Sequence, residues 1–405
     1  MNAYLIKASA PSPFKEYKKY LGGPPQNLFS TAACTPSEVA ISMTDETIDQ
    51  KVDFASDAEV VAIFMSTPDA LRAYEIADTF RSKGKTVVLG GLHTKAMPEE
   101  ALQHADAVLL GETEGIWEEL LEDVANGTLK KEYQRTVPVD LATVTPYPTN
   151  MLTPKDYDGS WTVLVGRGCP FTCAYCTIPG FLGKLRNRPV GQVIDEIKAS
   201  GVKWVELHSD NLMANRDYAM ELLSALEPLN IWWSGETNLN FVEDDELFEL
   251  AARSGLKYLL VGLETLSHKA LRSVGKGFQD PKHAKRWIAK LHERNIFVDS
   301  AFLFGFDQHT PEIFHDTADF VHDINIDVAH SVIVTPYPGT RLYQTLEKSD
   351  RILTKDWSKY DGANAVFEPA NMTAQQLEEG AYTFWQLTQK RTEQNIHRFY
   401  WSLWY

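Results

Sequence analysis

The chain has 405 residues, 44% hydrophobic and 23% charged, which is typical of a soluble globular protein of two or three domains. No apolar run approaches the roughly 20 residues of a membrane-spanning helix, so a membrane-spanning protein is excluded. The formal net charge is −16, and acidic residues outnumber basic ones both in residues 1–150 and in the remainder, which argues against a nucleic-acid-binding protein. The N-terminus lacks the basic-then-apolar pattern of a secretory signal, so we expect a cytoplasmic protein.

The first 125 residues alternate short apolar runs with helical patterns. Residues 60–65 are continuously apolar, as in a buried parallel strand, and Thr67-Pro68-Asp69 then starts a helix with proline in its first turn. This alternation predicts a doubly wound, Rossmann-like parallel sheet. Further strands are predicted at 3–8, 38–43, 86–89 and 107–110, and further helices at 99–104 and 115–124.

A second α/β domain is predicted after a connector. Residues 126–158 contain four prolines, Pro138, Pro146, Pro148 and Pro154, and show weak periodicity, which is typical of a linker. From residue 159 to 340 the alternation restarts with six β/α units, which predicts a partial (β/α)6 barrel. Residues 341–405 are predicted to form a C-terminal helical extension. The barrel strands are predicted at 161–165, 204–208, 231–235, 258–262, 296–304 and 329–335.

Three of the four cysteines fall close together after the first predicted barrel strand. Cys169, Cys173 and Cys176 have the spacing C-x3-C-x2-C. Three thiolates on one loop can ligate three irons of a 4Fe–4S cluster and leave the fourth iron open to a small molecule. The alternatives are a structural zinc site, which usually has four protein ligands, or three ordinary buried thiols. Cys34 stands alone and is predicted to be a small buried apolar side chain.

This cysteine segment, with Tyr175 before the last cysteine, resembles the C-x3-C-x-aromatic-C signature of the radical S-adenosylmethionine (SAM) superfamily. The resemblance implies that SAM chelates the open iron and that Tyr175 lies beside its adenine. It also implies that one-electron reduction cleaves SAM to methionine and a 5′-deoxyadenosyl radical, which abstracts a hydrogen atom from the substrate.

The resemblance also implies SAM contacts from residues near the ends of later strands. Asp210, Glu236 and Glu264 occupy such positions, and Gly305 lies in a segment similar to the glycine-containing adenine-binding motif. Arg186 follows the cysteine segment and suits the carboxylate of SAM. Taken without the resemblance, Asp210 as a helix cap, Glu264 as a buried structural glutamate and Arg186 as a surface charge remain open.

Residues 60–116 resemble the cobalamin-binding domain that is fused to some radical SAM enzymes. Glycines at strand ends permit close approach of a flat macrocycle. The D-x-H-x-x-G motif of histidine-ligated cobalamin proteins is absent. The alternatives are a capping or surface role for the histidine of this segment and a sheet that serves only as a scaffold. The residues of the resemblance that we assign to cofactor binding are Ser66, Thr67, Gly90, Gly91, His93, Gly111 and Glu112.

Residues 356–373 resemble a region shared by hopanoid methylases and anaerobic Mg-protoporphyrin cyclases, so the resemblance covers nearly the whole chain. The aromatic residues of segment 399–405 are predicted to pack into the core. The resemblance implies cobalamin-dependent methylation of an unactivated carbon. A radical SAM cyclase or rearrangement enzyme without methyl transfer and a non-catalytic cluster-binding scaffold are the alternatives. The expected substrate is a small molecule, lipid, tetrapyrrole or peptide, and the expected partner is a one-electron reductant such as flavodoxin or ferredoxin.

Overall fold

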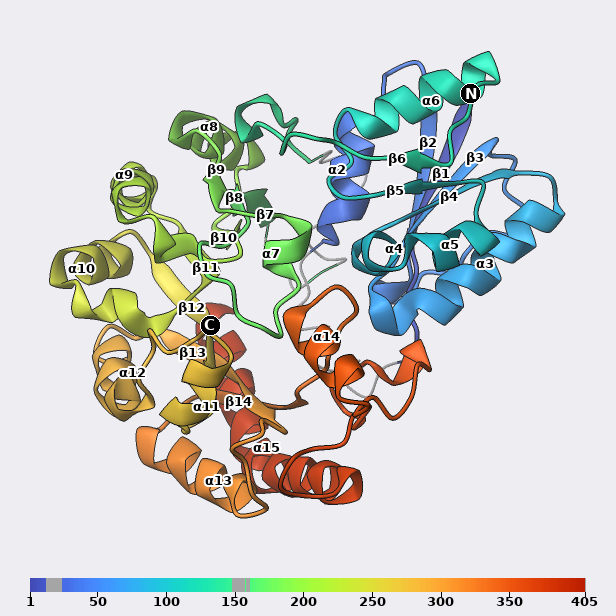
Figure 1. The fold of residues 1–405 in the computed structure, drawn as a ribbon. Coiled ribbons are helices and arrows are strands. Elements are labelled where there is room, and N and C mark those ends of the chain that lie inside the picture. Colours follow the sequence, from blue (N-terminus) through green and yellow to red (C-terminus); the bar gives the residue numbers. More distant parts are fainter. Residues whose placement is uncertain (12–23, 148–156, 158–160, 405) are drawn as a thin grey trace.

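The computed structural model describes residues 1–11, 24–147, 157 and 161–404, except for the side chains of 400–404. Two six-stranded, all-parallel sheets dominate it, one in each half of the chain (Figure 1). Their strands alternate with helices, which confirms the predicted α/β fold class. None of the described helices is long and apolar enough to cross a membrane.

The N-terminal sheet has the strand order β2-β1-β3-β4-β5-β6. Its strands are β1 (Asn2–Lys7), β2 (Ala40–Asp45), β3 (Val60–Phe64), β4 (Thr86–Gly90), β5 (Ala107–Leu109) and β6 (Glu132–Tyr133). Helices α3 (Ala70–Ser82), α4 (Leu92–Ala96) and α5 (Pro98–His104) lie on one side, and α2 (Gln26–Cys34) and α6 (Ile116–Asn126) on the other (Figure 1). The strand order reverses between β1 and β3, and in such sheets ligands bind at the carboxyl ends of the strands.

The second sheet is an open partial barrel whose strands follow one another in chain order. The strands are β7 (Trp161–Leu164), β10 (Trp204–His208), β11 (Trp232–Thr237), β12 (Leu256–Glu264), β13 (Phe297–Phe304) and β14 (Val328–Ile333). The outer helices are α8 (Val190–Ser200), α9 (Arg216–Leu226), α10 (Asp245–Arg253), α11 (His268–Ser273), α12 (Ala284–His292) and α13 (Ile313–Ile324). Apolar side chains of these helices and of the strand faces that they cover form the largest core.

The C-terminal region returns to both sheets. Helix α14 (Arg341–Lys348) is followed by an extended segment, and α15 (Ala374–Trp404) packs along β14 and α13. Phe399 near its end lies 4.6 Å from the ring of Phe297 and 5.8 Å from that of Trp204, centroid to centroid. Phe399 is therefore half-buried against other aromatic rings, beside the barrel core rather than inside it, whereas the side chains of Tyr400–Tyr405 lie outside the described residues.

Several elements differ from the sequence predictions. Helix α2 occupies residues that the apolar pattern does not single out as a helix. Strand β6 lies inside the predicted connector, where it adds an edge strand beside β5; Pro148 and Pro154 of that connector lie outside the described residues. A small antiparallel hairpin, β8 (Gly166–Arg167) and β9 (Arg186–Asn187), brackets the cysteine segment and the short helix α7 (Ile178–Phe181). Strands of two residues are too short to show periodicity.

Candidate functional site

The three clustered cysteines lie on the loop between β8 and α7, which we call the cluster loop (residues 168–177). Gly168 opens it with a φ of +87°, and a Cβ there would lie 2.4 Å from the Lys184 carbonyl oxygen, so only glycine fits. The Cys169 N–H donates to the Gly183 carbonyl oxygen at 3.2 Å. The loop is thus tied at its start to the chain that leaves it.

The cysteine thiols are half-buried and close enough to influence one another. Burial raises the pKa of the Cys173 thiol, and burial also raises the pKa of Cys176 to about 12, with neighbouring thiols adding to both shifts. Lys276 acts against the shift at Cys173, and iron–sulfur ligation requires thiolates, so the irons of a bound cluster would supply the further positive charge that favours them. Within the described part of the chain, no group of three or more His, Cys, Asp or Glu side chains is arranged to hold a metal ion, so cluster binding by these three thiols stays a prediction.

A buried ion pair lies beside this loop, at the end of β12. Glu264 has a φ of +63°, the left-handed region that a glutamate rarely adopts. Its carboxylate lies 2.5 Å from Lys276 Nζ and accepts a hydrogen bond from the Tyr175 hydroxyl at 3.1 Å. A Cβ at Gly262 would lie 2.2 Å from the Glu264 carboxylate, so glycine leaves room for this pair. Strained backbone around a buried ion pair is typical of a functional site.

The barrel interior carries ionisable side chains from β10 and β11. Thr162 donates to Glu206 at 2.6 Å, and the other carboxylate oxygen of Glu206 lies 3.5 Å from His208 Nδ1. Burial alone would lower the pKa of His208, but Glu206 raises it above the ordinary value. Burial raises the pKa of Glu236 to about 7, because protein surrounds this carboxylate although solvent reaches it inside the barrel. Proton exchange near neutral pH is therefore possible here.

Two glycines at strand ends of the N-terminal sheet have different roles. Gly91 follows β4 with a φ of +108°, and a Cβ there would lie 2.3 Å from the Met65 carbonyl oxygen, so this glycine serves chain packing. Gly111 follows β5 with a φ of +131°, and a Cβ there would meet only Lys95 Nζ, at 3.9 Å. Gly111 is therefore not required by contact with neighbouring protein atoms on the side where its Cβ would lie.

Comparison with known proteins gives the family. Residues 163–321 match the family described as the radical SAM superfamily. Over 368 residues the chain is 33% identical to bacteriochlorophyllide d C-12(1)-methyltransferase of Chlorobaculum tepidum, a match that covers 88% of this chain and 80% of that one. The chain belongs to the radical SAM superfamily.

Two solved radical SAM structures share the fold. TsrM from Kitasatospora setae, with cobalamin and a 4Fe–4S cluster bound, gives a TM-score of 0.65 at 16% identity and covers 86% of this chain and 78% of its own. OxsB with aqua-cobalamin and SAM bound gives a TM-score of 0.71 at 13% identity and covers 95% of this chain and 66% of its own. The likeness extends over both sheets.

Membership of the radical SAM superfamily confirms the prediction of an enzyme that uses a 4Fe–4S cluster and SAM. The assignment of Cys169, Cys173 and Cys176 as cluster ligands stays a prediction, and their shared loop supports it. Tyr175 and Glu264, both predicted to contact SAM, are hydrogen-bonded to each other beside this loop.

Two other predicted SAM contacts brace protein segments in the radical SAM domain. Asp210 accepts a hydrogen bond from the Gly168 N–H at 2.7 Å, so it holds the start of the cluster loop; burial raises its pKa. Arg186 donates to Glu112 at 2.9 Å, so the structure places a carboxylate of the N-terminal domain where we expected that of SAM.

Gly305 also packs against protein. It has a φ of +107°, and a Cβ there would lie 2.9 Å from the Leu377 side chain of α15. The glycine is therefore required by the close approach of the C-terminal helix, on the side where its Cβ would lie.

Most of the residues assigned to cobalamin are engaged within the N-terminal domain. His93 is fully buried, with Nδ1 3.3 Å from Thr67 Oγ1 and Nε2 3.4 Å from a Glu100 carboxylate oxygen. Burial lowers the pKa of His93, so the ring is neutral. Both ring nitrogens therefore face protein partners rather than open space.

Two more of these residues support the local chain. The Ser66 hydroxyl bonds to the Asp69 carboxylate and caps the turn before α3. A Cβ at Gly90 would lie 3.0 Å from the Phe64 ring, so this position serves the packing of β4 against β3.

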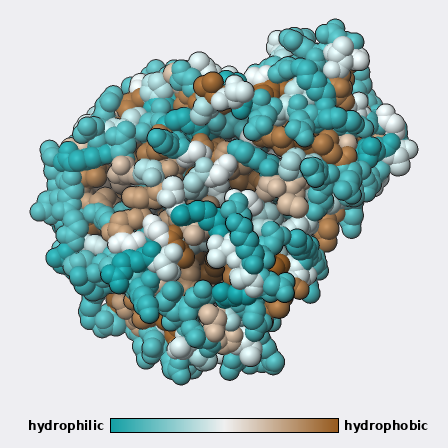
Figure 2. All heavy atoms as spheres, in the orientation of Figure 1, coloured by the Kyte–Doolittle hydropathy of each residue, from teal (hydrophilic) through white to brown (hydrophobic). Residues whose placement is uncertain are grey.

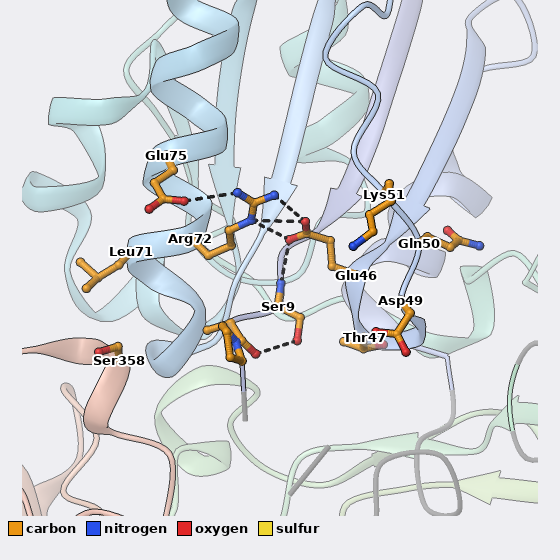
Figure 3. A pocket seen from close by; sticks show the side chains of 12 residues that line it. Ser9, Glu46, Thr47, Asp49, Gln50, Lys51, Leu71, Arg72, Glu75 and Ser358 are labelled. Carbon is orange, nitrogen blue, oxygen red and sulfur yellow. Dashed lines mark hydrogen bonds and ion pairs between the residues drawn. The ribbon is translucent and has the colours of Figure 1, made fainter. Parts of the chain in front are cut away.

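A separate pocket of about 610 Å³ lies at the carboxyl ends of β1 and β2, bordered by α3 and by Ser358 (Figure 3). Arg72 on its wall is neutralised by Glu46 at 2.7 Å and by Glu75 at 3.2 Å. None of the residues assigned to cobalamin lines this pocket.

Two residues of the site were missed by the sequence analysis. Arg167, two positions before Cys169, is buried between the domains, and Lys276 is buried beside Glu264. The available signals were an arginine inside the glycine-rich start of the cysteine segment and a lysine between two glycines. Their partners come from distant parts of the chain, so neither signal predicts the contact.

Proposed function

We propose that this chain is a cobalamin-dependent radical SAM methyltransferase and that its acceptor is an unactivated carbon of a tetrapyrrole. The observation that carries the proposal is the 33% identity, over 88% of the chain, to an enzyme named for methylating bacteriochlorophyllide d. This match is too long to involve the radical SAM domain alone. The cobalamin bound in the structurally similar TsrM supports a corrin at the N-terminal sheet.

The cysteine side of the site binds the cluster and SAM in this proposal. Cys169, Cys173 and Cys176 hold three irons, and Glu264 with Lys276 forms a polar wall beside them. When bound, the cluster and SAM supply a carbon radical that abstracts hydrogen, and the corrin supplies the methyl group. The task of the protein residues is to orient these groups and to exclude water.

The corrin side uses backbone rather than a histidine ligand. The open edge at Gly111 lies next to Glu112, which contacts the hairpin bracketing the cluster loop. In this proposal the corrin edge and the cluster loop lie on facing surfaces of the two domains. His93 is fully buried with protein partners at both ring nitrogens, so we propose that it packs the domain instead of binding cobalt.

The acceptor is proposed to bind at the barrel. Figure 2 shows apolar residues gathered in the hollowed middle of one face of the molecule, where a flat apolar ring would be shielded from water. The ionisable side chains of the interior, His208 and Glu236, are available to polar substituents of such a ring.

The test is an anaerobic assay of the reconstituted protein with methyl-labelled SAM, hydroxocobalamin, bacteriochlorophyllide d and reduced flavodoxin. We expect 5′-deoxyadenosine and labelled pigment to form together. Cys173→Ala should lower both products by at least about a hundredfold, since removing a cluster ligand removes the radical source. Mass spectrometry of the pigment and chromatography of the nucleoside measure the two.

Cys34→Ala is the control, because this half-buried thiol lies in the N-terminal core and burial raises its pKa. It should retain both products. Deoxyadenosine without labelled pigment, for every tetrapyrrole tried, would contradict the methyl-transfer proposal and favour a cyclase or rearrangement enzyme. A cluster-loaded protein that forms no deoxyadenosine would contradict both.

A further inference from the structure

The N-terminal domain holds the upstream end of the cluster loop through a buried arginine of the barrel. Arg167, two residues before Cys169, donates from Nη1 to Glu112 at 2.8 Å and from Nη2 to Glu114 at 2.7 Å. Ser30 of α2 accepts a third hydrogen bond at 2.8 Å. The guanidinium is 3% exposed, and although burial alone would lower its pKa, Glu114 raises it. Both carboxylates that form ion pairs with it come from the other domain.

The same domain holds the downstream end. Lys95 of α4 donates to the Phe181 carbonyl oxygen of α7 at 2.9 Å. Arg186 of β9 donates to the second Glu112 oxygen at 2.9 Å and to the Leu182 carbonyl oxygen at 3.0 Å. Glu112 therefore joins both strands of the hairpin that brackets the cysteines. Figure 1 shows α7 between the barrel and the helices α2 and α4.

Burying these charged groups costs solvation free energy, and their ion pairs have a specific geometry. Glu112 is 9% exposed and Glu114 12% exposed, so their charges are largely removed from water. Buried ion pairs add little net stability compared with apolar packing, but they fix geometry. Loss of one partner leaves the other charge buried and unpaired. Burial alone would raise the pKa of Glu112, but Arg186 and Arg167 hold it below the ordinary value. The ion pairs therefore serve to position the hairpin relative to the N-terminal domain more than to add binding energy between the two domains.

We propose that Glu112 is a positioning residue for the iron–sulfur cluster. Through Arg167 and Arg186 it fixes β8 and β9, the two strands that bracket the cluster loop. The N-terminal domain therefore forms part of the cluster site as well as the proposed corrin site. The inference rests on the radical SAM family and on these contacts. It requires neither bound cobalamin nor a methyl acceptor.

The test uses the full-length, cluster-loaded Glu112→Gln variant, without cobalamin. The variant keeps the shape of the side chain and removes the charge that both arginines share. We expect the rate of amide hydrogen exchange in residues 166–188 to rise at least about tenfold, since the coupling free energy of paired charges corresponds to a change of that size in the local opening equilibrium. We also expect the electron paramagnetic resonance spectrum of the reduced cluster to broaden or shift its g-values, with and without added SAM.

The matched control is Glu196→Gln. Glu196 of α8 pairs with Arg188, two residues beyond Arg186; this pair is equally buried but lies within the barrel. It should lower stability and leave the spectrum unchanged. If Glu112→Gln does not fold, Lys95→Met removes only the α7 contact and should raise exchange at 178–183. Wild-type exchange and spectrum in a folded Glu112→Gln, or the same spectral change in Glu196→Gln, would overturn the proposal. Neither result bears on methyl transfer.

Discussion

At the scale of single residues, the site combines groups that a motif marks with groups that only the fold brings together. The three cysteines and Tyr175 could be predicted because their chemistry and spacing are local in the sequence. The partners of Arg167 could not, since Glu112 lies 55 positions away and reaches it only once two domains dock. Likewise, nothing local distinguishes His93, which is fully buried, from a histidine that faces a cofactor.

Glu236 should make stability depend on pH. Its folded-state pKa of about 7 lies above the ordinary value because of burial, so the folded state favours the protonated acid. That contribution is present at acid pH and is lost as pH rises through about 7. We expect Glu236→Gln to be relatively more stable than the wild type at pH 8.5 than at pH 5.5. Urea unfolding of the reduced apoprotein at both pH values measures this.

The exposed Glu132→Gln is the control for the loss of one carboxylate. A stability difference between Glu236→Gln and the wild type that is equal at both pH values would contradict the interpretation of the barrel interior.

At the scale of elements, long apolar or periodic segments could be placed to within a few residues. The strand predicted at 204–208 is β10, with the same bounds. The hairpin β8–β9 and strand β6 could not be predicted, because two residues have no periodicity and their pairing depends on neighbours distant in sequence. The hairpin nevertheless carries Arg167 and Arg186, which contact the N-terminal domain.

The docking of α15 on α13 predicts opposite effects for two glycine substitutions. A Cβ at Gly380 of α15 would lie 2.0 Å from the Phe314 ring, so Gly380→Ala should lower the free energy of unfolding by about 1–3 kcal/mol although alanine favours helices. Gly191 of α8 has no atom within 4 Å of its Cβ position, so Gly191→Ala should raise stability by about 0.5–1 kcal/mol. Thermal or urea unfolding compares the two. Stabilisation by Gly380→Ala would contradict the close helix packing.

At the scale of the whole molecule, the C-terminal region joins the two sheets. Trp357 and Tyr360 are buried in the core on the α3 side of the N-terminal sheet, and Trp357 Nε1 donates to Glu100 at 2.9 Å. The resemblance of residues 356–373 to a shared family region predicts that the segment matters. It does not predict that Trp357 and Tyr360 pack on the first domain whereas Phe367 packs in the barrel core, because that division depends on the final arrangement of both domains.

Trp357→Ala should therefore destabilise the N-terminal domain. We expect a loss of about 3–5 kcal/mol, as for other large buried aromatic side chains, and faster proteolysis within residues 349–373. Trp232, which is 39% exposed at the start of β11, is the control position for removal of a tryptophan. Equal losses at Trp357 and Trp232, or unchanged proteolysis, would contradict the joining role.

The return of the chain to its beginning has a consequence for synthesis in the cell. The first domain to leave the ribosome lacks Trp357 and Tyr360, which complete its core beneath α3. Its apolar surface there stays exposed to water until residues 357–360 have been translated. Folding of this domain must therefore finish after the barrel has emerged. During that interval a chaperone would bind the exposed apolar surface.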